Sequence, residues 1–149
     1  MTDLHPRLDA LVARLVADVA PTGLDLDLGV YDATRRTWLV GGAQAVPAGF
    51  EPEGAVLVLG GRQHVLPPGH DDGVDVVAVV EDVQEWVIDE LGHGWPELVG
   101  PDGAFLGLLE PRRGPDDDVV WVTDARTVPL GRLSTVPVAL PPRGPRTEP

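Results

Sequence analysis

The segment over residues 74–91 constrains the fold more than any other part of the chain, because it combines a clear period with a start and a stop signal. Its apolar residues recur at intervals of three and four, which is the spacing of one buried helix face. They are Val76, Val79, Val80, Val83, Val87 and Leu91, with Trp86 at the edge of the stripe. The spacing predicts a helix whose role is packing.

Both ends of this helix carry the residues expected there. Asp71, Asp72 and Asp75 precede the stripe, where negative charge complements the helix dipole. Gly92-His93-Gly94-Trp95-Pro96 follows the last apolar position and ends the helix. Valine has only modest helix propensity, so a second interpretation stays open, with a strand over residues 76–80 and a helix that starts later.

A first helix is predicted over residues 6–19, where apolar positions again follow helical spacing. They are Leu8, Leu11, Val12, Leu15, Val16 and Val19. Asp3 is a candidate N-cap, Pro6 suits a first turn, and Pro21 with Gly23 ends the helix.

Two hairpins are predicted between the helices. Leucine and valine alternate with polar residues or glycine over residues 24–30, which is typical of a half-buried strand. The chain then turns at residues 32–35 and returns over 37–40. Residues 55–59 and 63–66 flank Gly60-Gly61-Arg62 and form the second hairpin.

Three further strands are predicted over residues 104–109, 119–123 and 127–130, with residues 111–118 and 124–126 in the connections. The order of elements favours an α+β fold: one antiparallel sheet of about five to seven strands with two helices packed on one face. Residues 1–133 form a single domain in this prediction, with Trp86 and Trp121 largely buried. Residues 134–149 are predicted to be a Pro-rich disordered tail that is dispensable for folding.

The charge of the chain excludes several partners. Twenty-four acidic residues oppose 11 basic residues, all of them arginine, and the net charge is −13. Nucleic acids and anionic membranes need a basic face and are therefore not expected as partners. A basic protein partner is expected instead, unless the acidity serves only solubility. The N-terminus lacks the features of a signal peptide and no apolar run is long enough to cross a bilayer, so a cytoplasmic location is expected.

The chain offers few groups for catalysis. It has no Cys and no Lys, and its one Ser, Ser134, lies beside the predicted tail. Covalent catalysis, thiolate metal sites and a Lys-containing phosphate loop are therefore not expected. We expect no enzyme activity and no cofactor.

Two groups of polar residues are candidate sites. In the first, His64, His70, Asp71 and Asp72 lie close in sequence and fit either a solvated loop or a metal site, although His5 and His93 do not complete a metal-binding spacing. Asp116-Asp117-Asp118 is better explained as a hairpin turn than as a calcium loop.

The second group lies on the long helix. Glu81, Glu85 and Asp89 follow one another at four-residue intervals and must face away from the valine stripe. We predict that these three carboxylates form the contact face for a basic partner. The alternatives are acid–base chemistry and a simply solvated helix face.

One pattern runs through several segments: Val83-Gln84-Glu85, residues 87–91 and Trp95-Pro96, followed by Val120-Trp121-Val122 and residues 128–133. This pattern resembles that of a family of small uncharacterised actinobacterial proteins. In that family the Trp-Pro is often followed by Cys-Pro and a His, whereas Glu97-Leu98-Val99-Gly100 stands here. The resemblance implies the same order of helix and strands in a bacterial cytoplasm, but no metal or redox role.

These observations favour a non-enzymatic acidic protein-interaction module, such as an immunity protein, inhibitor, adaptor or chaperone-like protein. Immunity proteins of polymorphic toxins are similar in general character, since many are small, acidic and α+β. The alternative is a small-molecule or metal-binding domain, including a metal-dependent hydrolase that uses His64, His70 and nearby carboxylates.

Overall fold

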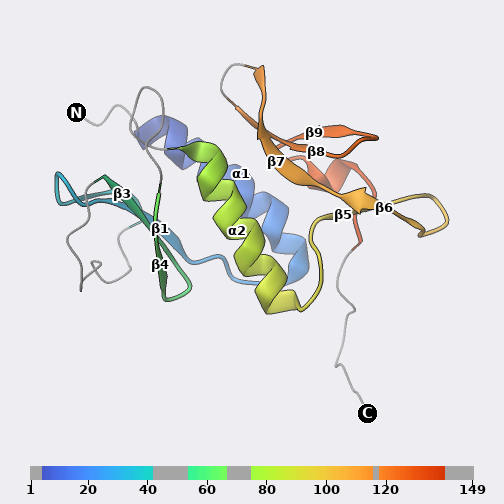
Figure 1. Cartoon of the computed structure of the whole chain (residues 1–149), viewed down its shortest axis with the longest axis horizontal. Coiled ribbons are helices and arrows are strands. Elements are labelled where there is room, and N and C mark those ends of the chain that lie inside the picture. The colour runs from blue at the N-terminus through green and yellow to red at the C-terminus, as the bar shows by residue number, and fades with distance from the viewer. Residues whose placement is uncertain (1–4, 42–53, 67–74, 116–117, 140–149) are drawn as a thin grey trace, which may run out of the picture.

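The computed structural model describes residues 5–41, 54–66, 75–115 and 118–139, with side chains from residue 8 onward (Figure 1). Two α-helices lie in these segments, α1 (His5–Val19) and α2 (Val76–Leu91). Short 3-10 helices follow at η1 (Ala20–Thr22) and η3 (Leu133–Thr135). No helix in these segments is long and apolar enough to cross a membrane.

The strands form three separate antiparallel sheets. The first has the order β2-β1-β3-β4 and contains β1 (Leu28–Asp32), β2 (Thr37–Val40), β3 (Ala55–Leu59) and β4 (Arg62–Val65). The second pairs β5 (Glu97–Val99) with β6 (Phe105–Leu108). The third has the order β7-β8-β9 and contains β7 (Glu110–Arg113), β8 (Val119–Val122) and β9 (Thr127–Pro129).

The predicted α+β class is confirmed, but the prediction of a single sheet of about five to seven strands is wrong, since the strands divide into three sheets. The helices lie between the four-stranded sheet and the C-terminal strands, and α2 contacts β3 on one side and β7 and β8 on the other (Figure 1). Proline explains part of the division, because it lacks the N–H that a sheet needs and favours edge strands. Pro111 and Pro129 lie in β7 and β9, the two edges of the third sheet.

The helix α2 begins and ends as the sequence predicts. The Asp75 carboxylate accepts hydrogen bonds from the backbone N–H groups of Val77 (3.1 Å) and Ala78 (3.2 Å), which caps the helix. Gly92 ends it in the left-handed conformation, with φ of 81°. Residues 76–80 are helical, so the alternative of a strand there is wrong. The helix α1 also matches its prediction, except that Val16 is 45% exposed.

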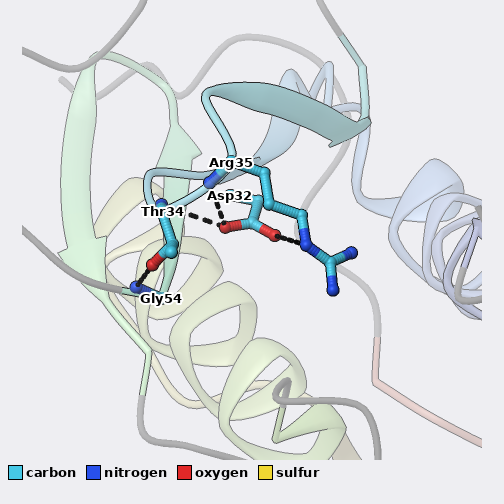
Figure 2. A network of polar contacts seen from close by, with 4 residues as sticks. All are labelled: Asp32, Thr34, Arg35 and Gly54. Carbon is cyan, nitrogen blue, oxygen red and sulfur yellow. Dashed lines mark hydrogen bonds and ion pairs between the residues drawn. The ribbon is translucent and has the colours of Figure 1, made fainter. Parts of the chain in front are cut away.

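The first hairpin starts later than predicted and is held at its turn by Asp32. Residues 24–27 lie outside β1, and Leu28 to Tyr31 are all buried because β1 is an inner strand. The Asp32 carboxylate accepts hydrogen bonds from the N–H groups of Thr34 (3.0 Å) and Arg35 (3.1 Å), as Figure 2 shows. The Thr34 hydroxyl in turn accepts from the Gly54 N–H at 2.8 Å, which ties the turn to the start of β3.

Two of the observed strands are absent from the prediction. The prediction puts residues 111–113 of β7 in a connection and Glu110 in no element, because Glu110-Pro111-Arg112-Arg113 shows no apolar alternation. The strand β5 is also absent from it, since β5 has only three residues. The second hairpin and the strands β6, β8 and β9 lie where strands are predicted, with ends that differ by at most one residue.

One hydrophobic core joins the three sheets to the helices. Its largest fully buried side chains include Trp95 and Trp121, whose rings meet edge to face with centroids 5.5 Å apart. Trp86 is 7% exposed, and the predicted burial of Trp86 and Trp121 is therefore confirmed. The core also takes in Leu15 from α1, Leu57 from β3 and Val83 from α2.

Residues 134–139, the first part of the predicted tail, contact β5. The Val99 N–H donates to the Pro137 carbonyl (2.9 Å) and the Ala139 N–H donates to the Glu97 carbonyl (2.9 Å), around a bridge between Leu98 and Val138. Val136 and Val138 pack partly buried against the core. Residues 140–149 lie outside the described residues.

Two truncations test where the folded domain ends. Ending the chain after Leu133 is expected to lower the free energy of unfolding by about 1–3 kcal/mol, because two backbone hydrogen bonds and the burial of two valines are lost. Ending it after Ala139 is the control and should leave the unfolding midpoint in urea unchanged. Equal midpoints for both truncated proteins would place the end of the domain at residue 133.

The packing of Trp121 gives a second test. Replacing Trp121 with Ala is expected to cost about 3–5 kcal/mol of stability, because a fully buried ring is lost and the surrounding core cannot close the cavity. Val16→Ala, at an exposed position, should change stability by less than about 0.5 kcal/mol. Urea unfolding followed by far-UV circular dichroism measures both, and similar midpoints for the two variants would contradict this placement of Trp121.

Candidate functional site

The predicted contact face lies on the exposed side of α2. Glu81, Glu85 and Asp89 are all exposed, while Val83 and Val87 on the opposite side are fully buried. Within the described part of the chain, neither Glu81 nor Glu85 has an ion-pair partner. Two unneutralised carboxylates one helical turn apart therefore face solvent.

Asp89 differs from the two glutamates because it is already paired. Its Oδ2 lies 3.0 Å from Nη1 of Arg62, which stands at the start of β4. Both side chains are about half exposed, at 50% and 44%, so solvent screens the pair and it contributes about 0.2–1 kcal/mol. This pairing could not be predicted from the helix period, because it joins residues 27 positions apart in different elements.

A histidine of β4 and a carboxylate of α2 interact close to the contact face. Nε2 of His64 is buried and has no hydrogen-bond partner among the described residues. Burial raises the pKa of the Asp82 carboxyl above its ordinary value of 3.8, the charge of His64 offsets this in part, and repulsion from Glu85 adds to it. His64 thus acts on a partly buried acid of the neighbouring helix.

The described residues give little support to the predicted metal site. His70, Asp71 and Asp72 lie outside the described residues, as does the side chain of His5. His93 lies at the end of α2 with Nδ1 2.9 Å from the carbonyl oxygen of Gly94. Within the described segments, no three His, Cys, Asp or Glu side chains come together in a way that could hold a metal ion. Asp116 and Asp117 also lie outside these segments, so the turn predicted there is not described.

A buried carboxylate that the sequence analysis missed lies at the end of α1. Asp18 is 3% exposed, and its carboxylate accepts three hydrogen bonds from the last third of the described chain. Oδ2 accepts from Nε1 of Trp121 (3.0 Å) and from the Gly131 N–H (2.7 Å), while Oδ1 accepts from the Leu133 N–H (3.1 Å). All three partners are donors, which suits an ionised carboxylate.

Burial and hydrogen bonding act on Asp18 in opposite directions. Loss of solvation raises the pKa of the Asp18 carboxyl, and the hydrogen bonds from Trp121, Gly131 and Leu133 together with the charge of Arg14 offset this only in part. Two features favour glycine at position 131. Its φ of 92° is a conformation that other residues rarely adopt, and a Cβ there would lie 2.9 Å from Cγ of Arg14. The glycine lets the backbone N–H approach the carboxylate.

A second buried polar group, Gln84, joins α2 to the C-terminal strands. Its Nε2 donates to the carbonyls of Trp95 (3.0 Å) and Leu109 (2.8 Å). Trp95 in turn packs on Trp121, the ring that donates to Asp18. Gln84, Trp95, Trp121 and Asp18 are therefore linked through the core, and their polar groups hold the two helices to the C-terminal strands.

A small hollow of about 220 Å³ lies beside Asp18. Its walls are mostly apolar and include Pro21, Trp95, Leu133, Val136 and Val138. Since the carboxylate oxygens of Asp18 already accept three hydrogen bonds from the protein, we interpret Asp18 as a structural group.

Comparisons of the chain with models of known families, with curated proteins and with solved structures found no match.

Replacing Asp18 with Asn tests its structural role. The amide keeps one oxygen for Trp121 and Gly131 but sets an N–H₂ group against the Leu133 N–H, so one buried donor loses its partner. The expected cost at neutral pH is about 1–3 kcal/mol, measured by urea unfolding. A variant as stable as the unmodified protein would show that these three bonds do not hold the fold.

The Asp18→Asn variant is also expected to change how the free energy of unfolding depends on pH. Because the folded-state pKa of Asp18 is raised above 3.8, the folded protein holds more protons than the unfolded chain between pH 3.8 and the raised pKa. The free energy of unfolding should therefore fall as pH rises through this window, and Asp18→Asn should flatten the fall. Asp82→Asn is the control, because the pKa of Asp82 is also raised. This variant should remove only the contribution of Asp82 to the slope of the free energy of unfolding against pH. An unaltered slope in Asp18→Asn would contradict the shift.

Proposed function

We propose that this chain is a non-enzymatic acidic protein-interaction module that binds a basic protein partner. An immunity protein, an inhibitor, an adaptor and a chaperone-like protein are the kinds of module that fit. Glu81, Glu85 and Asp89 form its contact face, which is called the α2 face below. A cytoplasmic location is part of the same proposal.

The observation that carries the proposal is that the carboxylates of Glu81 and Glu85 are not neutralised by any of the described residues. Both side chains are exposed and have no ion-pair partner in the described part of the chain. An arginine of a partner protein can therefore pair with either glutamate without displacing an arginine of the described residues. The net charge of −13 adds a long-range attraction that speeds the encounter with a cationic surface. The buried polar groups Asp18 and Gln84 are occupied by structural hydrogen bonds, so neither is available for recognition.

Within the α2 face, the two glutamates and Asp89 have different roles in the proposal. A partner arginine adds a new pair at Glu81 or Glu85, whereas at Asp89 it must compete with Arg62. The affinity is therefore expected to depend more on Glu81 and Glu85 than on Asp89.

A small-molecule or metal-binding role, including hydrolysis, is the second candidate. The buried Nε2 of His64, without a hydrogen-bond partner among the described residues and close enough to Asp82 to affect its pKa, is the observation in its favour. The protein purified without chelator and analysed for bound metal tests it, and stoichiometric metal would favour this candidate over the interaction module.

Charge reversal tests the α2 face. Glu81→Arg combined with Glu85→Arg is expected to weaken binding of a fluorescent arginine-rich peptide by about tenfold or more, since each lost charged hydrogen bond is replaced by repulsion. Binding should also become less sensitive to salt. Asp89→Arg alone should have a smaller effect. Fluorescence anisotropy at several salt concentrations measures both quantities.

The matched control is Asp9→Arg combined with Asp25→Arg. Both residues are exposed and lie away from α2 in the sequence, and the double change alters the net charge by the same amount. If the control weakens binding as much as the reversal on α2, the peptide senses only the total charge, and the α2 face is an ordinary solvated surface.

A further inference from the structure

Two large apolar side chains next to each other in β6 are exposed to solvent. Phe105 is 62% exposed and Leu106 is 53% exposed. The other large apolar residues with high exposure in the described segments, Val16 and Val65, stand singly in α1 and β4. Adjacent exposed apolar groups of this size are typical of contact sites.

An open hollow of about 340 Å³ adjoins Leu106. Most of its wall is apolar, and the residues that form it come from β5, from the turn after β5, from β6 and from the segment that pairs with β5. They include Leu98, Val99, Pro101, Leu106 and Pro137. The hollow is large enough for an apolar side chain of a partner.

Arg126 lines the same hollow from the turn between β8 and β9. No carboxylate of the described residues forms an ion pair with its guanidinium, although the chain has 24 acidic residues. Arg14, Arg35, Arg62 and Arg112 each have such a partner. A guanidinium that is not neutralised within the described segments, beside an apolar hollow, matches a ligand that carries an apolar group and a carboxylate close together.

The backbone of β6 is poorly suited to pairing with an added strand. Gly107 lies opposite Leu98 and Phe105 lies opposite Val99, so Leu106 has no residue opposite it in β5. Such a bulge interrupts the ladder and bends the strand away from regular pairing. Recognition at this surface must therefore come from side chains.

We propose that the hollow lined by Leu106 and Arg126, together with Phe105 next to Leu106 in β6, forms a second docking surface, here called the hairpin surface, for a segment of a partner protein that carries apolar and acidic residues. The charges favour a different protein over a second copy of this chain, because two copies at a net charge of −13 repel one another. The hairpin surface shares no residue with the α2 face. In this proposal it binds acidic groups, whereas the α2 face binds basic groups.

Two fluorescent peptides test the hairpin surface. One has Leu-Glu-Leu-Glu at its centre between Gly-Ser flanks, and the other has Leu-Gln-Leu-Gln in the same frame. At physiological salt, the protein is expected to bind the glutamate peptide about tenfold more tightly despite its own negative charge, because a charge-assisted pair with Arg126 outweighs the screened repulsion. Fluorescence anisotropy measures both affinities.

Three variants locate the binding. Arg126→Gln should remove the preference for the glutamate peptide while keeping the affinity for the glutamine peptide. Leu106→Thr should lower the affinity for both peptides by about fivefold or more, since apolar contact is lost. Val65→Thr is the matched control, because Val65 is similarly exposed on another strand, and its affinities should not change. Thermal unfolding confirms that all three variants remain folded.

Several results would overturn the proposal. They are the absence of binding to either peptide, an equal or higher affinity for the glutamine peptide, and a preference for glutamate that persists in Arg126→Gln. If sedimentation shows self-association that Leu106→Thr abolishes, the occupant is a second copy and the assignment to a partner protein is wrong. None of these results bears on the α2 face, which the arginine-rich peptide tests separately.

Discussion

The buried carboxylate of Asp18 is the interaction on which much of this structure depends. It joins the end of α1 to Trp121 in β8 and to the backbone of Gly131 and Leu133, all through donated hydrogen bonds. A buried carboxylate that lost these donors would carry a large desolvation cost. The requirement for three donors therefore fixes the position of α1 relative to the third sheet and relative to the segment that follows β9.

Gln84 makes the corresponding connection for α2. A single side-chain amide reaches the carbonyls of Trp95 and Leu109, which lie at the two ends of the β5–β6 hairpin. Together, Asp18 and Gln84 attach both helices to the C-terminal strands, while apolar contacts attach them to the four-stranded sheet.

Periodicity and capping residues were enough to predict both helices, because each buries one regular stripe. The hairpin around Gly60-Gly61 was also predictable from its turn residues. The division into three sheets was not, since pairing between distant strands leaves no local signal and β7 shows no apolar alternation. Asp18 did leave a signal, because it follows Leu11 and Leu15 on the buried stripe of α1. The exposure of Glu81 and Glu85 followed from the helix period, whereas the pairing of Asp89 with Arg62 depends on how β4 lies against α2.

The separation of Asp18 from its partners has a consequence for the order in which the chain folds during synthesis. The three hydrogen bonds span 103, 113 and 115 residues, so α1 emerges from the ribosome long before the groups that satisfy its carboxylate exist. Until Leu133 has been made, Asp18 gains more from water than from the interior, and the apolar stripe of α1 cannot be buried fully beside it. The four-stranded sheet and α2 can assemble first, because their contacts are closer in sequence. The final docking of α1 therefore waits until Trp121, Gly131 and Leu133 have been made.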